Sequence, residues 1–144
     1  MRSVLDVNVI IPLLDPNHSL HDKAHEWWST NRDLGWASCP ITENGAVRIL
    51  SHPSYNKQKR SAPADIINLL KSFASRTDHQ FWPEDITLRD EEIFSREYIL
   101  SSGQLTDIYL LALATKHEGK LVTFDQNISF NAVRIAKPQN LTVL

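Results

Sequence analysis

Residues 105–125, with the sequence LTDIYLLALATKHEGKLVTFD, join a predicted helix to a predicted strand. The run 108–114 is apolar all round, which is typical of a helix that is buried on most sides. Gly119 stands where a helix C-cap belongs, and the apolar run 121–124 that follows is typical of a buried strand. This helix and this strand are expected at the centre of an α/β domain.

Strands and helices alternate on both sides of this central segment. Pro12 bends a short helix near the start of the chain, and Pro40 suits the first turn of another helix, which His52-Pro53 ends. Alternation of this kind implies a mostly parallel sheet with helices on both faces. We therefore predict one three-layer α/β/α domain over residues 1–144. The further strands are expected at residues 3–5, 34–39, 81–83 and 141–144, and the further helices at residues 7–14, 20–32, 40–50, 63–74 and 90–100.

Composition places the chain in a broad class. At 144 residues and 42% hydrophobic, it can bury the core of one domain without disulfides, and its single Cys39 indicates a reducing compartment. The net charge of −2 excludes the strongly basic surface of proteins that hold nucleic acid by bulk electrostatics. No signal sequence is visible, and no apolar run approaches the roughly 20 residues of a membrane span. We therefore expect a cytoplasmic protein without a membrane segment.

Four acidic residues stand where a predicted strand ends or a predicted helix begins: Asp6, Glu43, Asp107 and Asp125. Each has an ordinary explanation, because an acid in the first turn of a helix stabilises it by about 0.3–1 kcal/mol, and Asp also shapes turns. Independent caps would not need to share one edge of a parallel sheet, where open α/β proteins bind ligands. Clustered carboxylates repel one another unless a cation neutralises them, and a cluster without Cys or paired His suits a hard divalent ion such as Mg²⁺ or Mn²⁺.

The residues around these acids resemble one known family. The motifs Leu5-Asp6-Val7-Asn8, Thr42-Glu43, Leu105-Thr106-Asp107 and Thr123-Phe124-Asp125 occur in the order and approximate spacing of PIN-domain nucleases, over nearly the whole chain. The size of the chain and the segment Arg48–Pro53 are similar to VapC toxins of toxin–antitoxin pairs. The resemblance implies a metal-dependent endoribonuclease in which Asp6, Glu43, Asp107 and Asp125 hold one or two Mg²⁺ or Mn²⁺ ions that activate water.

The resemblance also implies roles for neighbouring residues and partners. Asn8 and Thr123 would orient carboxylates or water, since outer hydrogen bonds fix the geometry of metal ligands, although each could equally be an ordinary helix-start or strand residue. Asp125 would act on the metal directly or through water. Further implications are an RNA substrate, products with 5′-phosphate and 3′-hydroxyl ends, a VapB-like antitoxin that covers or enters the acidic groove, and a homodimer.

A short basic run, Lys57, Lys59 and Arg60, lies between His52 and Pro63 in a stretch punctuated by Pro and Ser. On its own this run is typical of a solvated loop. Beside a nuclease site, it would contact phosphates of the RNA together with Arg48.

The histidines have no evident catalytic partner in the sequence, and metal-activated water needs no histidine as general base. His21 and His25 are four residues apart on a predicted helix and could bind zinc, but a solvated helix face is the simpler interpretation. The full set is His18, His21, His25, His52, His79 and His117.

Other classes of protein share parts of this pattern. A non-enzymatic signalling receiver domain has an acid after its first strand and a lysine near its end, which Asp6 and Lys137 match, but it needs two adjacent acids where Asp6 precedes Val7. A haloacid-dehalogenase-like phosphatase needs an acid at the position of Asn8. Within the nuclease class, a PIN nuclease of RNA processing, a DNA-cleaving PIN domain and an inactive binding module remain alternatives.

Overall fold

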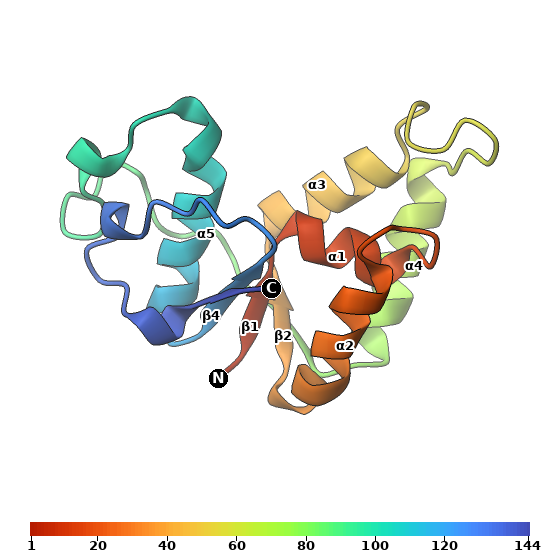
Figure 1. Ribbon diagram of the computed structural model, residues 1–144, viewed down its shortest axis with the longest axis horizontal. Helices are drawn as coiled ribbons and strands as arrows, with labels where there is room; N and C mark the ends of the chain where they lie inside the picture. The colour runs from red at the N-terminus through yellow and green to blue at the C-terminus, as the bar shows by residue number, and fades with distance from the viewer.

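Five parallel strands form the central sheet of the computed structural model, which describes all 144 residues (Figure 1). The strand order is β3-β2-β1-β4-β5, so the first strand of the chain lies in the middle. Every neighbouring pair is parallel, and the sheet that the sequence predicted as mostly parallel is therefore parallel throughout. The strands are β1 (Ser3–Leu5), β2 (Trp36–Ser38), β3 (His79–Phe81), β4 (Lys120–Thr123) and β5 (Leu141–Val143).

Helices cover both faces of the sheet, which confirms the predicted three layers (Figure 1). Successive strand residues point to opposite faces, so each face has its own core. Val4 and Leu121 pack with the buried side of α5, whereas Leu5 and Val122 pack on the other face. That other face carries α1 (Val7–Leu14), α2 (His21–Asn31), α3 (Pro40–Leu50) and α4 (Pro63–Ser75), and α5 spans Leu105–Lys116.

The middle of helix α5 is apolar because it is buried. Ile108 and residues 110–114 are fully buried between the sheet and the 3₁₀ turns η4 (Phe130–Ala132) and η5 (Pro138–Asn140). The predicted glycine C-cap is displaced by one residue, since Glu118 rather than Gly119 has a positive φ, of 55°. No helix, α5 included, combines the length and the apolar character needed to cross a membrane.

The helix predicted at residues 90–100 is wrong. The segment forms turns and one short 3₁₀ helix, η2 (Arg96–Tyr98). Its backbone pairs with a distant part of the chain instead: Ser95 N–H donates to the carbonyl of Ala132, and Arg134 N–H donates to the carbonyl of Ile93. The Asp90 side chain also accepts from the Glu92 N–H, a local bond that competes with helix formation.

Two predicted strands differ from the observed ones in their bounds. The strand predicted at 34–39 begins later, because a 3₁₀ turn, η1 (Arg32–Leu34), follows α2 directly. The strand predicted at 81–83 lies two residues earlier, at His79–Phe81, and pairs in register with β2. The strand predicted at the C-terminus forms as the edge strand β5.

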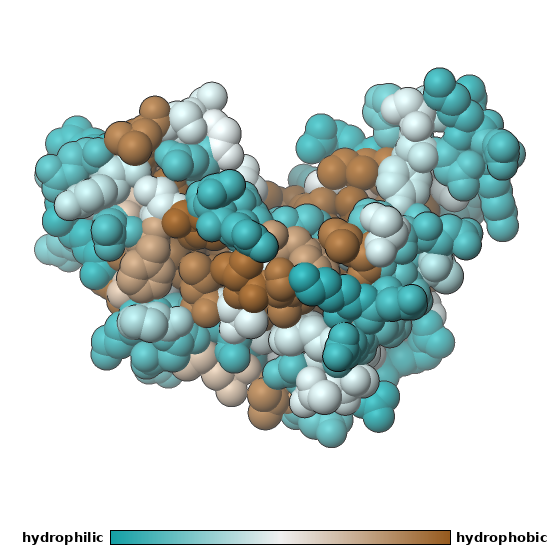
Figure 2. Space-filling model, viewed as in Figure 1, coloured by the Kyte–Doolittle hydropathy of each residue, from teal (hydrophilic) through white to brown (hydrophobic).

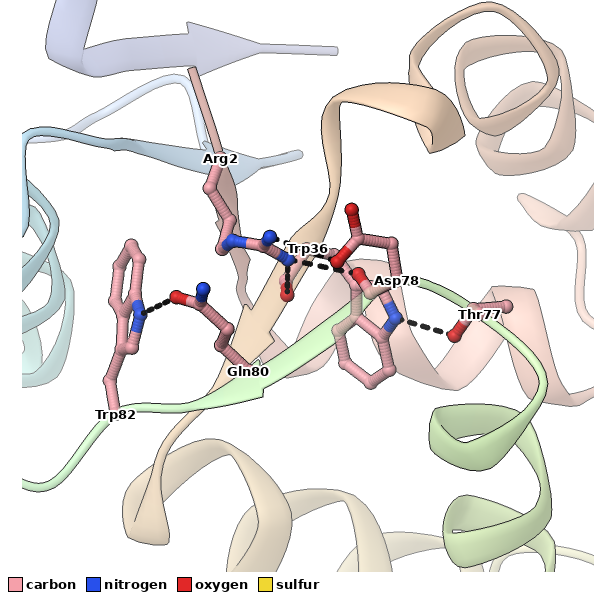
Figure 3. A network of polar contacts seen from close by, with 6 residues as sticks. All are labelled: Arg2, Trp36, Thr77, Asp78, Gln80 and Trp82. Atoms are coloured by element: carbon pink, nitrogen blue, oxygen red, sulfur yellow. Dashed lines mark hydrogen bonds and ion pairs between the residues drawn. The ribbon is translucent and has the colours of Figure 1, made fainter.

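An arginine joins the starts of β1, β2 and β3 (Figure 3). These are the N-terminal ends of the strands, opposite the ends that carry the acids. The Arg2 guanidinium donates to the carbonyl oxygens of Trp36 and Asp78, at 3.1 and 3.0 Å, and pairs with the Asp78 carboxylate at 2.9 Å. The backbone of Gly35 lies against the Arg2 guanidinium and has φ +80° and ψ 157°. A Cβ at this position would lie 2.3 Å from Nη1 of Arg2.

We expect Gly35→Ala to destabilise the protein, because the backbone conformation is one that only glycine adopts readily and the new methyl group collides with Arg2. The expected decrease in unfolding free energy is about 1–3 kcal/mol. Urea unfolding measures it, with Gly103→Ala as the matched control, since a Cβ at Gly103 meets nothing closer than 4.0 Å. Equal stability of the two variants would contradict this role for Gly35.

Candidate active site

Three aspartates meet where β1, β4 and α5 come together. Asp6 follows β1 and is 6% exposed, Asp107 lies in the first turn of α5, and Asp125 follows β4. The Asp107 carboxyl group lies close enough to both Asp6 and Asp125 for each of them to raise its pKa. Asp6 stands at the N-cap position of α1, but its side chain makes no capping hydrogen bond to the helix.

The pKa values of Asp6 and Asp107 are raised, whereas that of Asp125 is lowered. Burial is the largest cause that raises the pKa of Asp107, to about 7, and the neighbouring Asp125 and Asp6 raise it further. Burial also raises the pKa of Asp6, although the hydrogen bond from Thr123 opposes the shift. The pKa of Asp125 is lowered, chiefly because the Asn127 N–H donates to its carboxylate, at 2.8 Å. Near neutral pH Asp107 therefore binds a proton in part of the molecules, and a cation at this site would displace it.

Asn8 and Thr123 support this cluster through one hydroxyl group. Thr123 Oγ1 donates to Asp6 Oδ2 at 2.8 Å and accepts from Asn8 Nδ2 at 3.2 Å and from the Asp125 N–H at 3.0 Å. Asn8 Oδ1 in turn accepts from the Phe124 N–H at 3.1 Å. Thr123 is fully buried, so the hydroxyl is fixed by these partners rather than by bulk water. The arrangement orients Asp6 and the turn that carries Asp125.

Glu43 stands apart from the three aspartates, one strand further along the sheet. It lies in the first turn of α3, as the sequence predicted, and its Oε2 accepts a hydrogen bond from Ser38 Oγ at 2.5 Å. No three acidic, histidine or cysteine side chains are arranged to enclose a metal ion. The structure thus brings three of the four predicted acids together and leaves Glu43 at the adjacent strand end.

These strand ends lie below a hollow in the molecular surface. Figure 2 shows the hollow between two lobes, one formed by α3 and α4 and the other by the N-terminal part of α5 and the segment before it (Figure 1). Between α3 and α4 runs a groove of about 1030 Å³, mostly apolar, which Ser38, Glu43 and His79 line at the sheet. Arg48 also lines this groove.

The predicted basic run does not lie beside the acids. Lys57, Lys59 and Arg60 are exposed in the loop between α3 and α4, at the outer end of α3 (Figure 1). Glu43 is at the inner end of α3, and a helix of this length spans about 16 Å. Contacts of this loop with a substrate at the aspartates would therefore need a strand of RNA that extends along α3.

Sequence reasoning missed Ser38 and His79. His79 Nε2 lies 2.7 Å from Ser38 Oγ, a contact between two strands that the sequence did not predict. Burial lowers the pKa of His79. The only signal in the sequence is a polar residue, Ser38, at the end of an otherwise apolar strand.

His21 and His25 have a structural role. Their rings lie 4.3 Å apart, with His21 Nδ1 2.7 Å from the carbonyl oxygen of Pro12 and His25 Nε2 3.2 Å from that of Leu13. These carbonyl groups belong to the last turn of α1, where no backbone N–H of the helix is available to bond to them. The two histidines therefore join α2 to α1, and the prediction of a solvated helix face is wrong.

Comparison with known proteins agrees with this geometry. The family model described as PIN domain matches residues 3–135. The chain belongs to the PIN-domain family. Ribonuclease VapC44 of Mycobacterium tuberculosis is 43% identical to this PIN domain over 144 residues, which are 100% of each chain. Membership in the PIN-domain family excludes the two alternatives of a receiver domain and a haloacid-dehalogenase-like phosphatase.

Two solved structures share the fold of this PIN domain. VapBC2 from Rickettsia felis, bound to a DNA fragment from their promoter, matches with a TM-score of 0.60 and 14% identity over 100% of this chain and 99% of that chain. Mycobacterium tuberculosis VapC20, a Sarcin-Ricin loop cleaving toxin, matches with a TM-score of 0.60 and 11% identity over 94% of this chain and 99% of that one.

Proposed function

We propose that this PIN domain is a metal-dependent endoribonuclease and the toxin of a toxin–antitoxin pair. The observation that carries the proposal is the position of Asp6, Asp107 and Asp125 at the carboxyl end of the sheet, near enough that Asp6 and Asp125 both raise the pKa of Asp107. The full-length similarity to a protein named ribonuclease VapC44 supports RNA as the substrate. We further propose that the whole of residues 1–144 forms this one domain and acts in the cytoplasm, where RNA is available.

The donor set fits a hard divalent cation. Carboxylate oxygens are the ligands that Mg²⁺ and Mn²⁺ prefer, and the raised pKa of Asp107 marks negative charge that the protein leaves uncompensated. Asp6 and Asp107 would hold one or two such ions, with Glu43 and Asp125 completing the site directly or through water. When bound, the ion would supply an activated water molecule and offset the charge of the phosphate oxygens.

The residues of the chain position the reaction. Thr123 holds the Asp6 carboxylate, the Asn127 N–H holds that of Asp125, and Ser38 holds that of Glu43. A single strand of RNA would enter through the hollow above them (Figure 2). Because water is the proposed nucleophile, no 2′-hydroxyl attack is needed, and we expect products with 5′-phosphate and 3′-hydroxyl ends.

The test incubates the purified protein with end-labelled single-stranded RNA, stem-loop RNA and DNA of the same sequence, in Mg²⁺ or Mn²⁺. We expect cleavage of RNA, no cleavage of DNA, and fragments that ligate only through a 5′-phosphate. Products with 2′,3′-cyclic phosphate ends would contradict water as the nucleophile. Cleavage of DNA alone would replace the proposal with a DNA nuclease.

We also propose two protein partners. A VapB-like antitoxin would restrain the enzyme, and an arginine from it would pair with the aspartates in place of metal. A second copy of the chain would form a homodimer, which would cover exposed apolar side chains such as Leu100, 78% exposed, and Ile67, 51% exposed. Sedimentation equilibrium measures the dimer; a monomer at micromolar concentration would contradict it.

The position of the basic loop leads to a prediction about substrate length. We expect replacement of Lys57, Lys59 and Arg60 by Ala to weaken binding of long RNA and to lower its salt slope by about one unit for each phosphate that the loop neutralises. A short RNA that occupies only the aspartate site should bind unchanged. Fluorescence anisotropy measures both affinities at several salt concentrations, with Lys120→Ala, at the opposite edge of the sheet, as the control. Unchanged affinity and salt slope for long RNA would show that the loop does not touch the RNA.

A further inference from the structure

A chain of hydrogen bonds links strand β3 to Glu43. Ser38, the last residue of β2, donates its hydroxyl proton to Glu43 Oε2, with 2.5 Å between the oxygens. His79, the first residue of β3, places Nε2 2.7 Å from the same hydroxyl oxygen. The three side chains come from β2, β3 and α3, so the chain of bonds crosses three elements.

The parallel register of β2 and β3 produces this contact. Trp36 and Ser38 are two residues apart and point to the same face of the sheet. His79 pairs with Trp36 across the two strands, and the centroids of their rings lie 4.4 Å apart. Packing against the indole holds the imidazole ring, and Nε2 then meets Ser38.

The direction of the protons follows from the donors available. A carboxylate only accepts, so the single hydroxyl proton of Ser38 goes to Glu43. The Ser38 oxygen must then accept from His79, whose Nε2 therefore carries a hydrogen. The neutral tautomer with hydrogen on Nε2 and the imidazolium ion both meet this condition, so the chain of bonds does not depend on the charge of the ring. Ser38 is fully buried, so both partners of its hydroxyl group are protein side chains.

We propose that His79 is a positioning residue, which acts through Ser38 to hold the Glu43 carboxylate in the rotamer that the active site requires. Glu43 is half-buried and lines the wide groove between α3 and α4, so without this restraint its side chain would sample solvent. The Ser38 bond occupies Oε2 and leaves Oε1 for an ion. The inference rests on the proposed function, in which Glu43 is one of the metal ligands.

Titration of Mn²⁺ into the metal-free full-length protein tests the inference without an activity measurement. We expect Ser38→Ala to weaken Mn²⁺ binding by about 10–100-fold, the effect typical of removing an outer hydrogen bond to a metal ligand. His79→Leu and His79→Phe should weaken it by about tenfold, although Phe keeps the packing against Trp36. His79→Gln should restore most of the affinity, because its amide N–H can donate to Ser38.

Two further variants separate positioning from stability. The double variant Ser38→Ala/His79→Leu should bind Mn²⁺ no more weakly than Ser38→Ala alone, since His79 acts through Ser38. Thr77→Val removes the 2.8 Å hydrogen bond that Trp36 Nε1 donates to Thr77. The change therefore perturbs the Trp36 indole without removing a partner of Glu43. Thr77→Val should lower the melting temperature but leave the Mn²⁺ affinity unchanged.

The outcomes distinguish the two proposals. If the wild-type protein binds Mn²⁺ and both His79→Leu and His79→Phe bind it with the wild-type affinity, the role of His79 is overturned and the proposed function stands. Failure of His79→Gln to restore binding while His79→Phe stays folded would also overturn it. Wild-type protein that binds no Mn²⁺ would overturn the proposed function and this inference with it.

Discussion

We expect Asp107→Asn to cleave RNA at least about 1000-fold more slowly than the wild-type protein, a decrease of about 4 kcal/mol in transition-state stabilisation. Asp107 is the member of the aspartate cluster whose pKa both of the others raise. An asparagine keeps the shape and one oxygen but removes the negative charge that a divalent cation requires. Single-turnover cleavage of an end-labelled RNA in saturating Mn²⁺ measures the effect.

The matched control is Asp33→Asn, which removes the same charge from a side chain that is 99% exposed. This variant should cleave RNA at the wild-type rate, because Asp33 lies in η1, outside the site. Circular dichroism and the melting temperature of both variants show whether they are folded. A folded Asp107→Asn protein that retains even a tenth of the wild-type rate would contradict a metal-binding role for Asp107.

The same substitution should also have a large effect on stability. It should stabilise the metal-free protein, although it abolishes most of the activity. We expect the metal-free Asp107→Asn protein to be more stable than the metal-free wild type at pH 8 and equally stable near pH 4. The pKa of Asp107 is about 7 in the folded protein, against an ordinary value of 3.8, so the folded state binds this proton more tightly than the unfolded state. The cost of ionising Asp107 is therefore absent below pH 4, grows between pH 4 and 7 and is complete above pH 7.

Thermal unfolding of both proteins in chelator, from pH 4.5 to 8.5, measures this difference. A full shift to pKa 7 would correspond to about 4 kcal/mol, but Asp107 is half-exposed and solvent screens it, so we expect about 1–2 kcal/mol, or roughly 3–8 °C in melting temperature. Mn²⁺ should remove the penalty in the wild type alone, and more strongly at high pH, because binding displaces the proton. A constant difference across the pH range would show that Asp107 does not titrate in this way.

The sequence was sufficient to predict the α/β architecture and the position of the aspartates. An apolar run before Asp6, a fully apolar helix after Asp107 and an apolar strand before Asp125 each specify a buried element whose end is polar. Parallel strands then bring these ends to one edge without further information. The buried α5 and the central β1 are the elements for which local pattern and tertiary packing agree.

The failures share a physical cause, which is pairing between residues far apart in the chain. Residues 90–100 have a helical pattern, but the backbone groups of Ile93 and Ser95 bond to Arg134 and Ala132 instead of to residues four positions away in a helix. His79 meets Ser38 only because β2 and β3 pair in one particular register. Neither of these long-range contacts produces a periodic pattern of residues. Patterns of neighbouring residues in the sequence therefore could not predict them.

The dependence of RNA cleavage on Mn²⁺, compared between the wild-type protein and Asp6→Asn, tests the central claim most directly. We predict no cleavage by the wild type in chelator, a saturable increase in rate as Mn²⁺ is added, and no cleavage by Asp6→Asn at any Mn²⁺ concentration. The Asp33→Asn control should follow the wild type. Cleavage that persists in chelator, or in the folded Asp6→Asn protein, would contradict a nuclease site formed by metal and the clustered aspartates.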